Sequence, residues 1–68
     1  MITNPTILAN RNRADPDIAT QLVFRCEIGD KSYRHGCDFR HGMTVAQMGE
    51  QLQGWGRALC LFAEQNGG

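Results

Sequence analysis

The sequence has no long hydrophobic run, no excess of either charge and no motif of closely paired cysteines. Its 68 residues include seven basic and seven acidic side chains, so the formal net charge is zero. A bilayer-spanning helix needs about 20 apolar residues, and a protein that coats nucleic acid or anionic lipid needs an excess of lysine and arginine. We therefore predict no membrane association. The first residues also lack the basic and apolar segments of a secretory signal.

The cysteine content is low and odd in number. Cys26, Cys37 and Cys60 are the three cysteines, whereas a secreted disulfide scaffold usually has an even count. We expect a cytoplasmic, reducing setting. Cys26 and Cys37, with His35 and His41, are residue types that bind zinc, but they are offset along the predicted hairpin and form no Cys-x-x-Cys pair. We interpret them as core residues and predict no metal and no cofactor.

The short chain leaves little room for a catalytic cleft. One cysteine–histidine nucleophile pair is the only enzymatic arrangement that the composition allows, and it would need an orienting group and an oxyanion site. We therefore predict that the protein is not an enzyme.

Residues 44–65 carry the strongest pattern in the sequence, TVAQMGEQLQGWGRALCLFAEQ. Thr44 and Gln47 form a capping box, which predicts that a helix begins at this threonine. Large apolar residues follow at alternating spacings of three and four, which is typical of one helix face. They are Val45, Met48, Leu52, Trp55, Leu59 and Phe62.

A column of small residues runs beside this apolar stripe. Gly49, Gly56 and Ala63 recur every seven residues, and each glycine costs a helix about 1 kcal/mol relative to alanine. One interpretation is a packing seam for a second copy of the chain, formed by Gly49, Leu52, Trp55, Gly56, Leu59 and Ala63. Alternatives are packing on the protein's own sheet, or a bend at Gly54-Trp55-Gly56.

Residues 20–40 predict a β-hairpin. Leu22, Phe24, Cys26 and Ile28 alternate with polar or smaller positions, and Gly29-Asp30 suits a two-residue type II′ turn. Closing the turn at Ile28 and Lys31 places Tyr33, His35, Cys37 and Phe39 on the same inner face.

The remaining segments have weaker sequence patterns. Residues 1–18 predict a loosely ordered arm or a short edge strand near residues 6–11, and residues 66–68 predict a flexible tail. The expected fold is a single α+β domain of residues 1–68. It is an antiparallel hairpin, with or without a third strand, packed against one long C-terminal helix whose apolar face the sheet covers.

The predicted function is protein binding. The outer sheet face would carry Arg25, Glu27, Arg34, Asp38 and Arg40, and we expect it to dock on an unidentified protein partner as a small accessory or inhibitor protein. Proteins of this size are frequent in phages and mobile elements. One alternative is a nucleic-acid-binding ribbon that also uses Arg11, Arg13 and Lys31; another is a structural homodimer or larger homo-oligomer.

The terminal Gly67-Gly68 resembles the tail of ubiquitin-like sulfur carriers, which also begin with a hairpin and a helix. Those proteins need further strands after the helix, whereas here the tail follows the helix at once. Gly67 also suits a helix C-cap.

Overall fold

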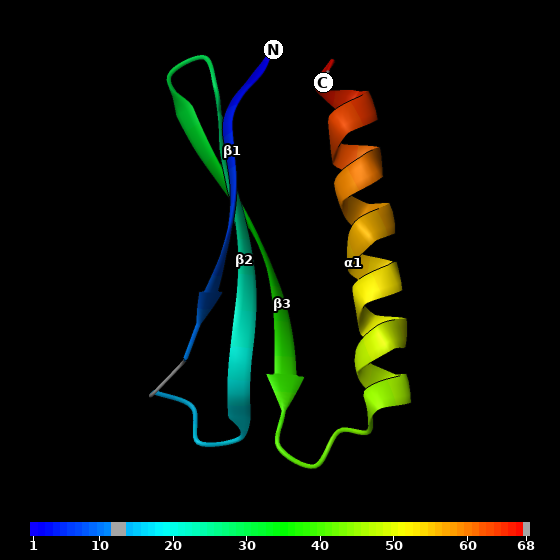
Figure 1. Cartoon of the computed structure of the whole chain (residues 1–68). Helices are drawn as coiled ribbons and strands as arrows, with labels where there is room; N and C mark the ends of the chain where they lie inside the picture. The colour runs from blue at the N-terminus through cyan, green and yellow to red at the C-terminus, as the bar shows by residue number, and fades with distance from the viewer. Residues whose placement is uncertain (12–13, 68) are drawn as a thin grey trace.

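The computed structural model describes residues 1–11 and 14–67 as a three-stranded sheet and one helix (Figure 1). The strands are β1 (Ile2–Asn10), β2 (Ile18–Ile28) and β3 (Lys31–Arg40), and the helix is α1 (Val45–Gln65). The sheet is antiparallel in the order β1-β2-β3, with β2 in the centre. The predicted α+β class is confirmed, and the third strand is present.

The hairpin of β2 and β3 has the predicted register. Ile28 pairs with Lys31, Cys26 with Tyr33, Phe24 with His35 and Leu22 with Cys37. Gly29 has a φ of +63° while Asp30 does not have a positive φ, which is the combination that a type II′ turn requires. The glycine is needed here because other residues rarely adopt that backbone conformation.

Strand β1 is longer than the sequence indicated. It begins at Ile2, which pairs with Ile28, and so it includes the Asn4-Pro5 pair that we expected in a loose end. The register shifts between Thr3 and Thr6, so these residues form a bulge. Asn4 has a φ of +53°, and proline cannot donate to the ladder. The bulge accommodates both residues within an edge strand.

Helix α1 begins as the sequence predicts and is continuous. The Thr44 hydroxyl accepts a hydrogen bond from the Gln47 amide, at 3.1 Å, and the Gln47 side chain accepts one from the Thr44 amide, at 2.9 Å. The helix runs without a break through Gly54-Trp55-Gly56, in agreement with the predicted single helix. The helix ends at Asn66, whose amide donates to the carbonyl of Phe62.

The helix packs mainly along β3, at one side of the sheet. Phe62 is the main apolar contact. Its ring lies 4.8 Å from the ring of His35, 5.6 Å from Tyr33 and 6.3 Å from Phe24, measured between centroids.

The sheet covers only part of the apolar stripe of the helix: Met48, Trp55, Leu59 and Phe62 are half-buried, whereas Val45 and Leu52 are exposed. No residue of α1 is buried, Leu52 is 41% exposed and Val45 is 86% exposed. The helix lies too far toward β3 for the sheet to cover the whole stripe. On the inner face of β1, Ile7, which is paired with Phe24, is 57% exposed.

Within residues 1–11 and 14–67, every fully buried residue therefore belongs to the sheet. These residues are Ile18, Val23, Cys26, Cys37 and Phe39. Cys26, Cys37 and Phe39 lie on the inner face as predicted, whereas Val23 is buried on the outer face, between Leu8 and Gly36 in the register. A core this small contributes little stabilisation for a chain of this length.

Candidate functional site

The outer sheet face carries the predicted charged residues. The register places Arg25 opposite Arg34, Glu27 opposite Ser32 and Gln21 opposite Asp38, all on the face away from α1. Arg25, Glu27, Arg34, Asp38 and Arg40 are all exposed. Arg13, which we included in the alternative nucleic-acid surface, and Gly68, in the tail, lie outside the described residues.

Arg25 and Arg34 form a like-charged pair across β2 and β3. Residues directly opposite on neighbouring strands have Cβ atoms about 4.5–5.5 Å apart, and like charges at that position destabilise the sheet. Glu27 is diagonal to Arg34 on the same face, where an ion pair could relieve the repulsion. A Glu27 carboxylate oxygen accepts a hydrogen bond from the Asn4 side chain at 3.1 Å. Because asparagine is neutral, Glu27 keeps its negative charge, and Arg25, Arg34 and Glu27 together leave a net charge of plus one at this place.

A hollow of about 290 Å³ surrounds this pair. We call it the arginine hollow. Its lining includes residues from all three strands: Asn4, Thr6, Leu8, Arg25, Cys26, Glu27, Ser32, Tyr33 and Arg34. Guanidinium groups bind carboxylate and phosphate in a two-pronged arrangement, and the neighbouring Ser32 hydroxyl can donate a further hydrogen bond. The hollow is suited to a single acidic group.

The bulge in β1 helps to shape this hollow. The register brings Thr6 of β1 opposite Arg25, and the Thr6 hydroxyl donates to the carbonyl of Asn4 at 3.3 Å. The Thr3 hydroxyl donates to the Glu27 carbonyl at 3.2 Å. Sequence reasoning allowed a short edge strand near residues 6–11 but left Asn4 outside it, because Pro5 normally interrupts a strand. It did not connect Asn4, Thr6 and Leu8 with the arginine pair.

Asp38 lies farther along the outer face and is already engaged. Its carboxylate accepts a hydrogen bond from the Gln21 side chain at 2.6 Å. Gly36 makes this contact feasible, since a Cβ at that position would lie 3.0 Å from the Gln21 amide nitrogen. The predicted surface is therefore divided into the arginine hollow and a region around Asp38, where the carboxylate is hydrogen-bonded within the chain.

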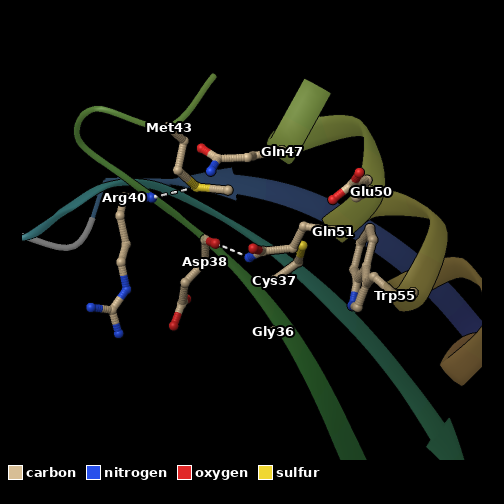
Figure 2. Close-up of a pocket in the computed structure, with 10 residues that line it drawn as sticks. Gly36, Cys37, Asp38, Arg40, Met43, Gln47, Glu50, Gln51 and Trp55 are labelled. Carbon is tan, nitrogen blue, oxygen red and sulfur yellow. Dashed lines mark hydrogen bonds between the residues drawn. The ribbon is translucent and has the colours of Figure 1, made fainter. Parts of the chain in front are cut away.

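A second cavity lies between the free edge of β3 and the first half of α1 (Figure 2). We call it the edge groove; its volume is about 870 Å³. Its lining residues are Gly36, Cys37, Asp38, Arg40, Met43, Gln47, Glu50, Gln51, Gly54 and Trp55.

Part of the backbone at the end of this edge is hydrogen-bonded by the chain itself. A two-residue turn closes on a hydrogen-bonded pair, so the backbone groups of Gly36, Asp38 and Arg40 point away from β2. The Gln51 side chain donates to the Asp38 carbonyl, and the Arg40 amide donates to the Met43 sulfur at 3.1 Å. These contacts limit strand addition at this end of β3.

The edge groove does not assemble a nucleophilic centre. Burial raises the pKa of the Cys37 thiol above its ordinary value, while its hydrogen bond with Gln51 acts in the opposite direction. A raised pKa keeps the thiol protonated and unreactive. Among residues 1–11 and 14–67, no three histidine, cysteine or acidic side chains gather as a metal site would require.

The predicted helix seam faces open space. A Cβ added to Gly49 or Gly56 would meet no atom within 4 Å. Leu52 is exposed, while Leu59 and Ala63 are half-buried. Trp55 departs from the other seam residues because it lines the edge groove, and its indole nitrogen is buried without a hydrogen-bond partner.

Comparison of the chain with protein-family models, with curated proteins and with solved structures gave no match. Among the described residues, no helix combines the length and the apolar character needed to cross a membrane.

Proposed function

We propose that this chain is a small non-enzymatic protein that binds another protein, as an accessory or inhibitor, through the outer face of its sheet. The observation that carries the proposal is the opposition of Arg25 and Arg34 in a hollow whose lining has Glu27 as its one acidic side chain, so these three side chains leave a net charge of plus one. Like-charged cross-strand pairs reduce stability, and a ligand carboxylate would offset that cost.

The proposed partner presents an aspartate, a glutamate or a C-terminal carboxylate to the arginine hollow. Arginine pairs this group with two parallel hydrogen bonds. Ser32 lines the same hollow, and its hydroxyl can donate to a remaining oxygen lone pair. Leu8 offers an apolar contact beside the charged centre. This combination of a charged anchor and a small apolar neighbour is typical of protein interfaces.

The proposed setting is the reducing cytoplasm. Cys26 and Cys37 are buried free thiols and Cys60 is an exposed free thiol. Cysteine pairs are the usual device of small secreted domains, and this chain does not use its cysteines in that way.

Nucleic-acid binding is the second candidate, because phosphate would also fit two guanidinium groups. The electrically neutral chain argues against it, and so does the inward position of Tyr33, whose ring packs against Phe62 instead of offering a stacking surface. A duplex would also need several phosphate contacts to bind at physiological salt concentration.

Fluorescence anisotropy with two labelled probes, a hexaglutamate peptide and a DNA duplex, tests the proposal at low salt. We expect the peptide to bind the wild-type protein and to lose affinity in Arg25→Ala and Arg34→Ala. Arg57→Ala is the matched control, because Arg57 is an exposed arginine of α1. Equal binding by all three variants would contradict the proposal, and preferential retention of the duplex would assign the face to nucleic acid.

Capture of the native partner completes the test. Bait protein carrying Arg25→Glu and Arg34→Glu should lose a partner that wild-type bait and Arg57→Glu bait both retain from the host lysate. A partner that remains bound to the doubly substituted bait would show that docking does not use the arginine hollow.

A further inference from the structure

The free chain exposes more surface than a compact protein of its size. Its accessible surface is 5130 Å², whereas a folded monomer of 7.6 kDa is expected to expose about 4,300 Å². The radius of gyration is 13.3 Å, against an expected value of about 11 Å for 68 residues. The excess of about 800 Å² matches the area that each partner contributes to a standard protein interface.

The excess surface includes the flank of α1 that carries Gly49, Leu52 and Gly56, which we call the open flank. Gln47, Gln51 and Gly54 lie on the flank that lines the edge groove. The helical repeat places Gly49, Leu52 and Gly56 on the opposite flank, which faces the β1 side of the sheet. That flank has no covering element within the described residues, and Ile7 is exposed on the neighbouring inner face of β1. An amphipathic helix derives most of its stability from packing, so a partner on this flank would add to the stability of α1.

The geometry points to a second copy of this chain as the partner, packed with its α1 antiparallel to the first across a two-fold axis level with Gly54. In this register each large residue of the open flank faces a small residue of the other copy. The pairs are Val45 with Ala63, Leu59 with Gly49, and Leu52 with Gly56. Each pair occurs twice, as a two-fold interface requires.

Three features of the open flank support self-association. Its large and small residues alternate, so the open flank supplies both the side chains that project into the interface and the gaps that receive them. The charged residues of the helix, Glu50, Arg57 and Glu64, lie outside the open flank. The two glycines allow close approach, because nothing in the monomer occupies the space next to their Cα atoms. The open flank therefore brings no charge repulsion to a pair of identical helices.

This inference is independent of the arginine hollow, which lies on the other face of the sheet. The dimer would present two such hollows, one from each copy. A failure of the dimer test therefore leaves acid recognition by Arg25 and Arg34 intact. Conversely, a failure of the peptide-binding test leaves the dimer in place.

Sedimentation equilibrium on the full chain, from a few micromolar to a few hundred micromolar, measures the association. We expect a monomer–dimer equilibrium. Gly56→Leu fills a recess and should weaken the dimer by about tenfold to a hundredfold, the range expected from overpacking an interface. Gly54→Leu is the matched control, because it adds the same side chain to the same helix on the flank that lines the edge groove, and it should leave the association unchanged.

A compensating exchange separates a specific contact from general damage. In the double variant Leu52→Gly with Gly56→Leu, the large and the small residue of one predicted pair change places. A leucine then still faces a glycine across the interface, and the number of glycines in the helix is unchanged. It should recover dimerisation relative to Gly56→Leu alone. Circular dichroism checks that each variant is folded, which we expect because a Cβ at Gly54 or Gly56 meets nothing within 4 Å. A wild-type monomer at a few hundred micromolar, or equal effects of Gly54→Leu and Gly56→Leu, would overturn the inference.

Discussion

The side chain of Gln51 in α1 donates a hydrogen bond to the backbone carbonyl of Asp38 in β3. This contact fastens the first half of the helix to the sheet, where α1 has no buried residue. The second half is held by the rings around Phe62. The helix is thus attached at two places, one polar and one aromatic, and each can be tested separately.

We expect Gln51→Ala to lower the free energy of unfolding by about 0.5–1.5 kcal/mol, the net value of one hydrogen bond. The loss should fall at the low end because the Asp38 carbonyl lies at an exposed edge and can bind water instead. Urea unfolding followed by circular dichroism measures it. Gln53→Ala, a glutamine-to-alanine change at an exposed position of the same helix, should have no effect; equal losses in both variants would remove Gln51 as an attachment point.

Phe62→Ala should cost about 2 kcal/mol of unfolding free energy. Fully buried phenylalanines cost about 3–5 kcal/mol when truncated, and the ring of Phe62 is only half-buried. Leu61→Ala is the neighbouring control, because Leu61 is 57% exposed and should change stability by less than about 0.5 kcal/mol. If the two variants unfold at the same urea concentration, the aromatic cluster does not hold the helix.

Arg25→Glu should stabilise the protein while removing its acid-binding activity. The substitution turns a like-charged cross-strand pair with Arg34 into an opposite-charged one, which is worth roughly 0.2–1 kcal/mol. Added salt should stabilise the wild-type protein and destabilise this variant, since screening weakens repulsion in one and attraction in the other. Thermal unfolding at two salt concentrations shows both effects. A variant less stable than wild type at low salt would contradict the proposed repulsion.

The three cysteines should differ in reactivity. Cys60 is exposed, whereas Cys26 and Cys37 are buried, and burial also raises the pKa of the Cys37 thiol. At pH 8, iodoacetamide should modify Cys60 first, as mass spectrometry of the digested protein would show. Cys60→Ser is the control, in which labelling should require denaturant. Rapid modification of Cys37 in the folded protein would contradict its burial.

The same raised pKa predicts how stability changes at alkaline pH. In the unfolded chain the Cys37 thiol ionises near its ordinary pKa of 9.0, whereas in the folded chain it stays protonated to a higher pH. The unfolded state therefore binds fewer protons above pH 9, and this thiol makes folding less favourable as pH rises. Cys37→Ala, compared with wild type at pH 8 and pH 10, should reduce that decline.

The hairpin and the helix start could be predicted because local chemistry determines them. Gly29-Asp30 selects the turn, the turn selects the register, and a slip by one residue would exchange the two faces of the sheet. Thr44 and Gln47 mark the helix start through hydrogen bonds within one turn of the chain. None of these features depends on a distant contact.

Strand β1 and the position of the helix could not be predicted in this way. Pro5 and the positive φ of Asn4 normally indicate a loop, and here pairing with β2 imposes strand geometry on both sides of a bulge. A helix stripe likewise shows which residues avoid water without showing what covers them. The arginine pair follows from the register, whereas the hydrogen bond that Asn4 donates to Glu27 comes from a part of β1 that the sequence placed outside the expected strand.

The order of the elements along the chain has a consequence for how the protein forms. Each strand pairs with its neighbour in sequence, and α1 follows last. Mostly local pairing favours rapid folding, so the three strands can assemble before the helix docks. Because α1 shares no core residue with the sheet, its undocking need not unfold β2, and backbone amides of α1 should exchange with deuterium sooner than those of the central strand.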